Sequence, residues 1–200
     1  MENIISDVHT DWRDVLANIY LKHKTHIDVI VEKYEENNIL PKQQYIFRTF
    51  NYFDKDALRV VILGQDCYHS LSKNSLPLAC GLSFSVDEGC KTTPPSLRVI
   101  FDELHYEFGV RRTKTDLSDW SMQGVLMLNC ALTVKQGKPN SHAKVWKPFT
   151  NDLIKYIAEH CKHVVYIFWG EFAKGYTKYI NHTQNYVLEC RHPSPLAQSK

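Results

Sequence analysis

The sequence lacks the patterns that would place it in a membrane, a secretory pathway or a repeat array. No apolar run approaches the roughly 20 residues that span a bilayer, and the first residues, MENIISDVHTDW, have neither the basic nor the apolar region of a secretory signal. Internal repeats, low-complexity segments and Gly/Ser-rich linkers are also missing. We therefore expect a single domain over residues 1–200, with a helical amino-terminal part over about residues 1–55 and no membrane role.

Cysteine spacing and net charge exclude further classes of protein. The six cysteines form no C-x-x-C pair, so an iron-sulfur cluster is not indicated, and reduced thiols indicate an intracellular protein, cytoplasmic or nuclear. A formal net charge of +2 is only mildly basic, so any nucleic-acid contact must be a local patch. Neither a P-loop nor a G-x-G-x-x-G follows an expected strand, which argues against a nucleotide hydrolase.

Short apolar segments alternate with helical patterns along the chain. Residues 96–108 begin after TTPP, place their apolar residues on one helical face, and are followed by a similar pattern at residues 151–161. Strands that are apolar on both faces and alternate with helices indicate a parallel sheet covered on both sides. The sequence predicts an α/β protein, a three-layer α/β/α fold with a central four-stranded parallel sheet. Its strands are expected at residues 59–64, 125–129, 164–169 and 186–189.

The residues that follow each expected strand matter most, because ligands of parallel sheets bind outside the carboxyl ends of the strands. The four strands are followed by GQDCYH, NCALTV, WGEF and CRHPSPL. Three of these four segments contain polar groups capable of chemistry. The sequence therefore predicts a functional site at this edge of the sheet.

Six motifs occur along the chain in the order GQDCYH, GLSFSV, TPPSL, MLNCALTV, SHAKVW and HPSPL. Together they resemble the uracil-DNA glycosylase family, which is marked by GQDPYH and HPSPL, over about residues 41–196. The resemblance implies a monomeric, monofunctional enzyme without metal or cofactor. Such an enzyme turns uracil out of single- or double-stranded DNA and hydrolyses its N-glycosidic bond, which leaves an abasic site for base excision repair. It also implies a protein inhibitor or a replication protein as candidate further partners.

The resemblance implies two catalytic residues. Asp66, at the exit of the first strand, orients a water or stabilises an oxocarbenium-like sugar. His192, in RHPSP, donates a hydrogen bond in its neutral form to uracil O2 as negative charge develops on the leaving base. A lone aspartate near glycine more often satisfies loop amides, and a lone histidine more often lies on the surface. The surrounding motifs therefore support these roles.

Four uracil-binding residues are also implied. Asn129 offers one acceptor and two donors, which match N3–H and O4 of uracil, whereas cytosine presents the reverse pattern. Phe84 is the ring on which uracil stacks, although a core phenylalanine is the ordinary alternative. Tyr68 blocks the C5-methyl group of thymine, and Gln65 helps to hold the base and the water.

Four residues are implied on the DNA-binding face. Leu196, at the tip of a proline-stiffened loop, suits a wedge that enters the base stack. Ser96 and Ser194 offer donors to phosphates, with helix capping as the alternative, and His142 matches a motif histidine near the phosphates and the water. Residues 129–151 contain no acidic residue, and their four lysines can lie along the phosphate backbone or form an ordinary solvated face: Lys135, Lys138, Lys144 and Lys147.

The sequence departs from the family pattern in several places. Cys67 replaces the motif proline, so the loop loses a fixed φ and gains a backbone N–H that needs a partner. The link SLSKNSLPLAC, residues 70–80, is longer than usual, and SHAKVW is one residue tighter than the common spacing, as in the poxviral branch. These differences leave an alternative open, a catalytically weak or inactive DNA-binding or processivity module that retains the fold.

The segment QQYIFRTFNYF, residues 43–53, superficially suggests a peptide that binds a sliding clamp. Its spacing does not fit that motif well. We predict instead a helix that packs Ile46, Phe47 and Phe50 into the core.

Overall fold

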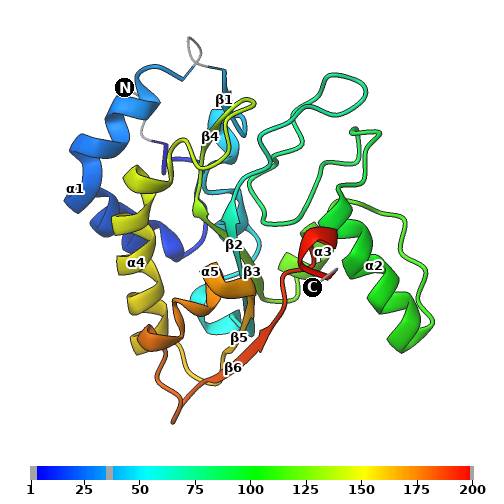
Figure 1. Cartoon of the computed structure of the whole chain (residues 1–200). Coiled ribbons are helices and arrows are strands. Elements are labelled where there is room, and N and C mark those ends of the chain that lie inside the picture. Colours follow the sequence, from blue (N-terminus) through cyan, green and yellow to red (C-terminus); the bar gives the residue numbers. More distant parts are fainter. Residues whose placement is uncertain (1–3, 35–37, 199–200) are drawn as a thin grey trace.

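The computed structural model describes residues 4–34 and 38–198 (Figure 1). Its main sheet consists of parallel strands in the order β3-β2-β5-β6. Each strand lies within a residue or two of its predicted bounds, so the four-stranded parallel sheet is confirmed. The strands are β2 (Val60–Asp66), β3 (Val125–Ala131), β5 (Val165–Trp169) and β6 (Tyr186–Cys190).

Helices cover both faces of this sheet (Figure 1). α1 (Trp12–Val31) and α4 (Ala143–His160) pack against each other on one face, and α2 (Pro95–Phe108) and α3 (Ser118–Ser121) lie on the other. The predicted three-layer α/β/α fold is confirmed. Two short strands, β1 (Ile39–Leu40) and β4 (Val134–Lys135), pair antiparallel with each other. The shorter helical elements are α5 (Gly170–Lys174), α6 (Pro195–Gln198) and the 3-10 helices η1 (Gln43–Tyr45), η2 (Arg48–Asn51), η3 (Lys55–Ala57) and η4 (Thr177–Tyr179).

Alternate residues of β2 pack into the two helical layers. Val61 and Leu63 belong to the core shared with α1 and α4, whereas Ile62 belongs to the core shared with α2. Successive side chains of a strand point to opposite faces of the sheet. A strand covered on both faces therefore needs apolar residues at consecutive positions, which is the pattern in VVIL.

The pairing of β2 brings functional segments together at one edge of the sheet. Gly64 pairs with Asn129, so the carboxyl ends of β2 and β3 lie side by side. β5 pairs with β2 only as far as Ile62 and Ile167. The two strands separate beyond that point, and the space at their carboxyl ends is where a parallel sheet accommodates a ligand.

One predicted helix begins earlier than expected. The helix predicted over residues 151–161 is α4, which starts at Ala143. Pro148 lies in its second turn and has no N–H to donate to the carbonyl of Lys144. Trp146 and Phe149 are nonetheless fully buried, and their packing holds the first turns against the core.

The helix predicted over residues 43–53 is interrupted in the structure. The segment forms two short 3-10 helices, η1 and η2, rather than one α-helix. The predicted packing is confirmed, because Ile46, Phe47 and Phe50 are all buried in the main core. These three side chains are therefore buried in the core and are not accessible to a partner protein.

The six cysteines are free thiols in the structure, and five of them are buried. Within residues 4–34 and 38–198, no helix has both the length and the apolar character needed to cross a membrane.

Candidate active site

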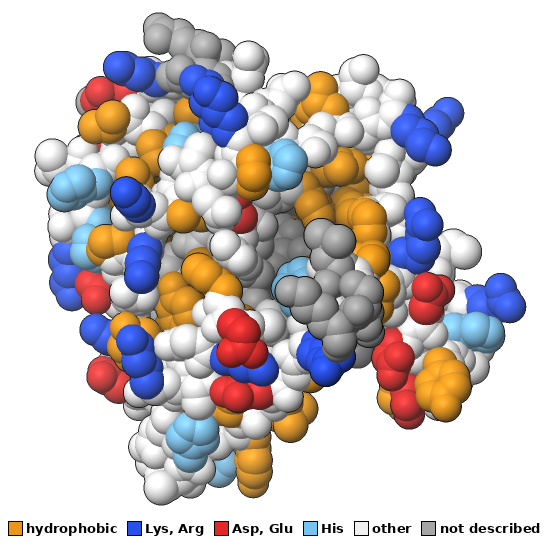
Figure 2. Space-filling view, in the orientation of Figure 1, with side chains coloured by type: hydrophobic (Ala, Val, Ile, Leu, Met, Phe, Trp, Pro, Cys, Tyr) orange, Lys and Arg blue, Asp and Glu red, His pale blue; other side chains and the backbone are white. Residues whose placement is uncertain are grey.

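A cavity of about 250 Å³ opens at the carboxyl ends of β2 and β3. Its volume is below the roughly 300–1,000 Å³ of sites for drug-sized ligands and suits a single planar ring. The space-filling view shows this face hollowed near its centre (Figure 2). Seven of the ten predicted site residues line the cavity: Gln65, Asp66, Tyr68, Phe84, Ser96, Asn129 and His192.

Two backbone N–H groups hold the Asp66 carboxylate. The N–H of Asn140 donates to Oδ2 at 2.5 Å, and the N–H of Cys67 donates to Oδ1 at 3.1 Å. Burial raises the pKa of Asp66, while these two donors and the nearby His69 act in the opposite direction. The carboxylate thus satisfies loop amides and also faces the cavity, as a group that orients water or stabilises positive charge must do.

The ring of His192 is fixed in one tautomer by the residue two positions later. The backbone N–H of Ser194 donates to Nδ1 of His192 at 3.0 Å. Burial lowers the pKa of His192, so the ring is neutral at neutral pH. A neutral imidazole that accepts at Nδ1 has its proton on Nε2. His192 therefore brings an N–H donor to the cavity that it lines.

Gly170 allows His192 to lie close to the end of β5. It has a φ of +85°, and a Cβ atom at this position would lie 2.9 Å from the Cβ of His192. Any side chain at residue 170 would therefore displace the histidine. Gly170 is not among the predicted site residues, although the glycine directly after a strand in WGEF is the signal for it.

Phe84 has an unusual backbone conformation, with a φ of 62° in the left-handed region. Its ring packs edge-on against Trp169 at a centroid distance of 5.2 Å and lies 5.8 Å from the ring of His192. The hydroxyl of Tyr68 donates to the carbonyl of Phe84 at 3.2 Å. Such a conformation costs about 1–3 kcal/mol and persists where surrounding contacts hold it. It places an aromatic ring on the cavity wall.

The amide of Asn129 is buried and lies directly against Gly64 of the neighbouring strand. A Cβ atom on Gly64 would lie 2.3 Å from Oδ1 of Asn129. A glycine at position 64, two residues before the end of β2, is therefore required for the amide to reach the cavity. The arrangement presents hydrogen-bonding groups at the base of a space that admits a flat ring.

Asn140 connects two of the predicted residues and is not itself among them. Its Oδ1 accepts a hydrogen bond from Nε2 of Gln65 at 3.0 Å, while its backbone N–H bonds Asp66. Its φ of 61° lies in the left-handed region, which asparagine tolerates better than most residues. Its position in PNSH, next to a predicted motif, is the signal that could have identified it.

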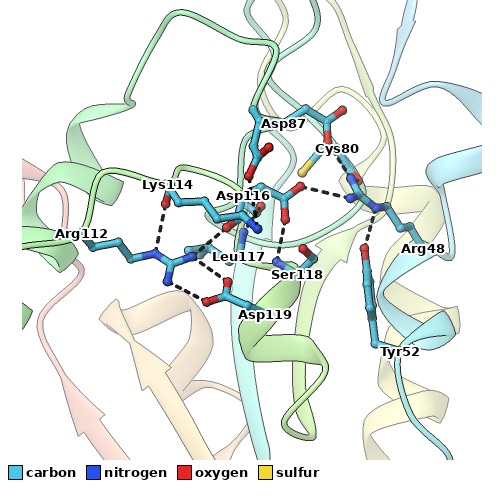
Figure 3. Close-up of polar contacts among 12 residues, drawn as sticks. Arg48, Tyr52, Cys80, Asp87, Arg112, Lys114, Asp116, Leu117, Ser118 and Asp119 are labelled. Atoms are coloured by element: carbon cyan, nitrogen blue, oxygen red, sulfur yellow. Dashed lines mark hydrogen bonds and ion pairs between the residues drawn. The ribbon is translucent and has the colours of Figure 1, made fainter.

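Arg48 anchors both ends of the loop that contains Phe84 (Figure 3). Its Nη1 donates to the carbonyl of Cys80 at 3.1 Å and to the carboxylate of Asp87 at 2.7 Å. Its Nη2 lies 3.1 Å from the carboxylate of Asp116. Charge-assisted hydrogen bonds of this kind are stronger than neutral ones. One guanidinium therefore joins the two ends of the loop and ties them to Asp116.

Three predicted residues are not in the cavity lining. Ser194 acts on His192 through its backbone N–H. His142 precedes α4, its Nδ1 lies 2.9 Å from Oγ1 of Thr133, and burial lowers its pKa. Leu196 belongs to α6, but its side chain lies outside the described part of the chain. The DNA-binding roles of these residues stay predictions.

The predicted lysines lie at the surface. Lys138, Lys144 and Lys147 are exposed, and Lys135 is half-buried. Figure 2 shows Lys and Arg side chains spread around this face rather than gathered in one patch. A contact with phosphates would therefore use several separated charges.

Two kinds of sequence comparison identify relatives of the chain. The family model of the Uracil DNA glycosylase superfamily matches residues 50–200. The uracil-DNA glycosylases of Bacillus cereus (strain AH187) and Bacillus mycoides (strain KBAB4) are 40% and 41% identical to the chain over 201 residues. These matches cover 98% of this chain and 85% of each relative.

Solved structures with the same fold agree with that result. The crystal structure of mimivirus uracil-DNA glycosylase is 30% identical, with a TM-score of 0.85, and the match covers 92% of this chain and 68% of that chain. A mimivirus UNG variant in complex with UGI is 29% identical, with a TM-score of 0.88, and the match covers 97% of this chain and 73% of that chain. The chain belongs to the uracil-DNA glycosylase family.

Proposed function

We propose that this chain is an active uracil-DNA glycosylase, a hydrolase that releases uracil from DNA. Water adds to C1′ of the deoxyribose as the bond to N1 of uracil breaks, the released uracil gains a proton at N1, and an abasic site remains. One observation supports the proposal most directly. A single cavity of nucleobase size is lined by the carboxylate of Asp66, the imidazole of His192, the ring of Phe84 and the amide of Asn129.

Asp66 and His192 act on opposite charges that develop as the bond breaks. The ionised Asp66 orients the water and stabilises the positive sugar, and Nε2–H of His192 donates to uracil O2. A donor aimed at developing charge is worth roughly 3–4 kcal/mol. Asp66 must be ionised and His192 must be neutral for these roles. Burial raises the pKa of Asp66 and lowers the pKa of His192. kcat/KM therefore rises with pH through these two ionisations and then levels off.

The other cavity residues select the base. The ring of Phe84 stacks on the flipped uracil, a contact worth roughly 1–3 kcal/mol. The Asn129 amide pairs with N3–H and O4, and Tyr68 occupies the space that the thymine methyl group needs. Gln65 helps to hold base and water, fixed by its bond to Asn140. Together these contacts distinguish uracil from cytosine and thymine.

DNA contacts surround the cavity. Ser96 lines the cavity in the first turn of α2, where backbone and hydroxyl donors suit a phosphate. Ser194, His142 and the surface lysines extend this contact, and Leu196 enters the base stack in place of the flipped nucleotide.

We propose that the chain acts as a monomer and as one domain over residues 1–200, since α1 shares a core with the sheet. It works in the cytoplasm or nucleus, where its DNA substrate lies.

The test is release of uracil from a uracil-containing oligonucleotide. We expect activity from the wild type and a loss of about 10²- to 10⁴-fold in Asp66→Asn. Asp102→Asn, which removes an exposed carboxylate on α2, is the matched control and should match the wild type. Equal activity of Asp66→Asn, or no release by a folded wild type, would overturn the proposal. DNA binding without release would favour the non-catalytic module.

The inhibitor UGI provides an independent arm of the test. A mimivirus UNG variant is solved with UGI bound. We expect UGI to inhibit uracil release by this chain, and undiminished release at saturating UGI would contradict that expectation.

A further inference from the structure

Cys67 lies directly after the catalytic Asp66 and contacts two residues of the neighbouring strand β3. Its Sγ donates to the carbonyl of Ala131 at 3.2 Å and accepts a hydrogen bond from Nδ2 of Asn129 at 3.5 Å. The side chain is buried, with 5% of its surface exposed. Asn129 and Ala131 lie two positions apart on β3 and so face the same side of the sheet. One sulfur atom therefore bridges the base-binding amide and the strand that supports it.

This contact favours one of two orientations of the Asn129 amide. Rotation of an amide by 180° exchanges its oxygen and its nitrogen. The thiol proton is used by Ala131, so the sulfur presents lone pairs to Asn129 and favours Nδ2 over Oδ1. Burial raises the pKa of the Cys67 thiol well above its usual value, so that proton is retained at neutral pH. On its other side the amide is confined by Gly64, where Oδ1 rests.

We propose that the Cys67 thiol is a positioning group that holds the Asn129 amide in the orientation that pairs with uracil rather than cytosine. The inference rests on the proposed uracil excision and names a residue that supports its selectivity through Asn129. Uracil presents a donor at N3 and an acceptor at O4, and cytosine presents an acceptor and a donor at the equivalent positions. A rotated amide would therefore match cytosine, and removal of the thiol permits that rotation.

A buried thiol that only fills space would predict a different result. Poorer packing lowers the thermal stability of the whole protein, but it does not change which base is bound. Hydrogen bonding to Asn129 predicts a change in base selectivity that depends on the chemistry of residue 67. Variants of similar size and different hydrogen-bonding capacity separate these two roles.

The experiment compares Cys67→Ala, Cys67→Val and Cys67→Ser with the wild type. Valine fills the space without hydrogen bonding, which keeps the test valid if alanine destabilises the fold, and the serine hydroxyl can donate and accept as the thiol does. Cys161→Ala removes a buried thiol at the end of α4 and is the matched control. The measurements are inhibition by free uracil, calorimetric binding of free uracil, and kcat/KM for uracil and cytosine in matched oligonucleotides.

We expect the Ala and Val variants to bind free uracil about 5- to 10-fold more weakly and to raise the cytosine-to-uracil ratio of kcat/KM by a similar factor. Cys67→Ser should retain values close to those of the wild type. Unchanged affinity and selectivity in the Ala or Val variant, or a Ser variant no better than Val, would overturn the role of Cys67. A folded wild type that releases no uracil would instead overturn the proposed function. Calorimetric binding of free uracil does not require catalysis, so it would still test the role of Cys67.

Discussion

Replacement of Cys67 by proline, the residue of the family motif, removes a hydrogen-bond donor from the carboxylate of Asp66, the proposed catalytic group. The N–H of Cys67 donates to Oδ1 of Asp66 at 3.1 Å, and a proline has no N–H. A hydrogen bond to a charged group is worth about 1.5–3 kcal/mol when buried, and about 1–2 kcal/mol for this partly exposed carboxylate. Removal of that bond favours the protonated form, so Asp66 should bind its proton about 5- to 30-fold more tightly.

The expected result is a shift of the acid limb of kcat/KM to higher pH in Cys67→Pro. Activity should fall by the same 5- to 30-fold factor at acid pH and recover as Asp66 ionises at higher pH. The other groups around the carboxylate, His69 on its loop and the tautomer-fixed His192 across the cavity, are unchanged. Cys67→Ala keeps the backbone N–H and is the control for removal of the thiol. Superimposable acid limbs for the Pro and Ala variants would refute the reasoning.

The remaining predictions concern the supports of the cavity and the DNA-binding face. Ser194→Pro removes the N–H that donates to Nδ1 of His192 and should lower kcat about 10-fold. Ser194→Ala keeps that N–H and should keep the wild-type kcat. Equal kcat values for the two variants would contradict the tautomer argument. Gly170→Ala should lower kcat/KM at least about 10-fold, because its Cβ meets His192, and wild-type kinetics would show that the histidine tolerates the displacement. Arg48→Met should lower Tm by about 4–8 °C and weaken the binding of free uracil, because the loop that contains Phe84 loses its anchor. Arg48→Lys should restore part of both effects. Unchanged uracil affinity in Arg48→Met would exclude a role for the arginine in holding that loop. Lys144→Glu with Lys147→Glu should reduce the salt dependence of DNA binding, by about one unit of slope for each phosphate that the variant no longer neutralises.

The sheet and much of the cavity could be predicted because their signals are local. The strands are short apolar runs, and Asp66 and Asn129 lie within three positions of the ends of such runs, so the parallel arrangement brings them to one edge. His192 and Phe84 depend on the motifs that contain them, since isolated histidines and phenylalanines have no preferred function. The start of α4 could not be predicted because Pro148 resembles a helix boundary, whereas burial of Trp146 outweighs its cost.

The residues that support the cavity could not be predicted in the same way. Arg48 is separated from Cys80 by 32 positions and from Asp116 by 68, and no pattern near Arg48 indicates either partner. The close contact of Gly170 with His192 joins residues 22 positions apart, and the bonds of Asn140 to Gln65 and Asp66 join residues more than 70 positions apart. Each of these contacts joins segments whose proximity is a consequence of the complete fold.

Cys67 illustrates how a departure from a motif can be compensated within a site. A proline would hold the loop by restricting φ, which limits the unfolded chain as well as the folded one. The cysteine leaves φ unrestricted and instead makes three hydrogen bonds in the folded protein, one from its N–H to Asp66, one from its thiol to Ala131 and one from Asn129 to its sulfur. The absence of the proline therefore does not by itself indicate an impaired enzyme. In the proposed mechanism, the backbone N–H of Cys67 supports the Asp66 carboxylate and its thiol supports the Asn129 amide. The Pro variant tests the first effect, and the Ala and Ser variants test the second.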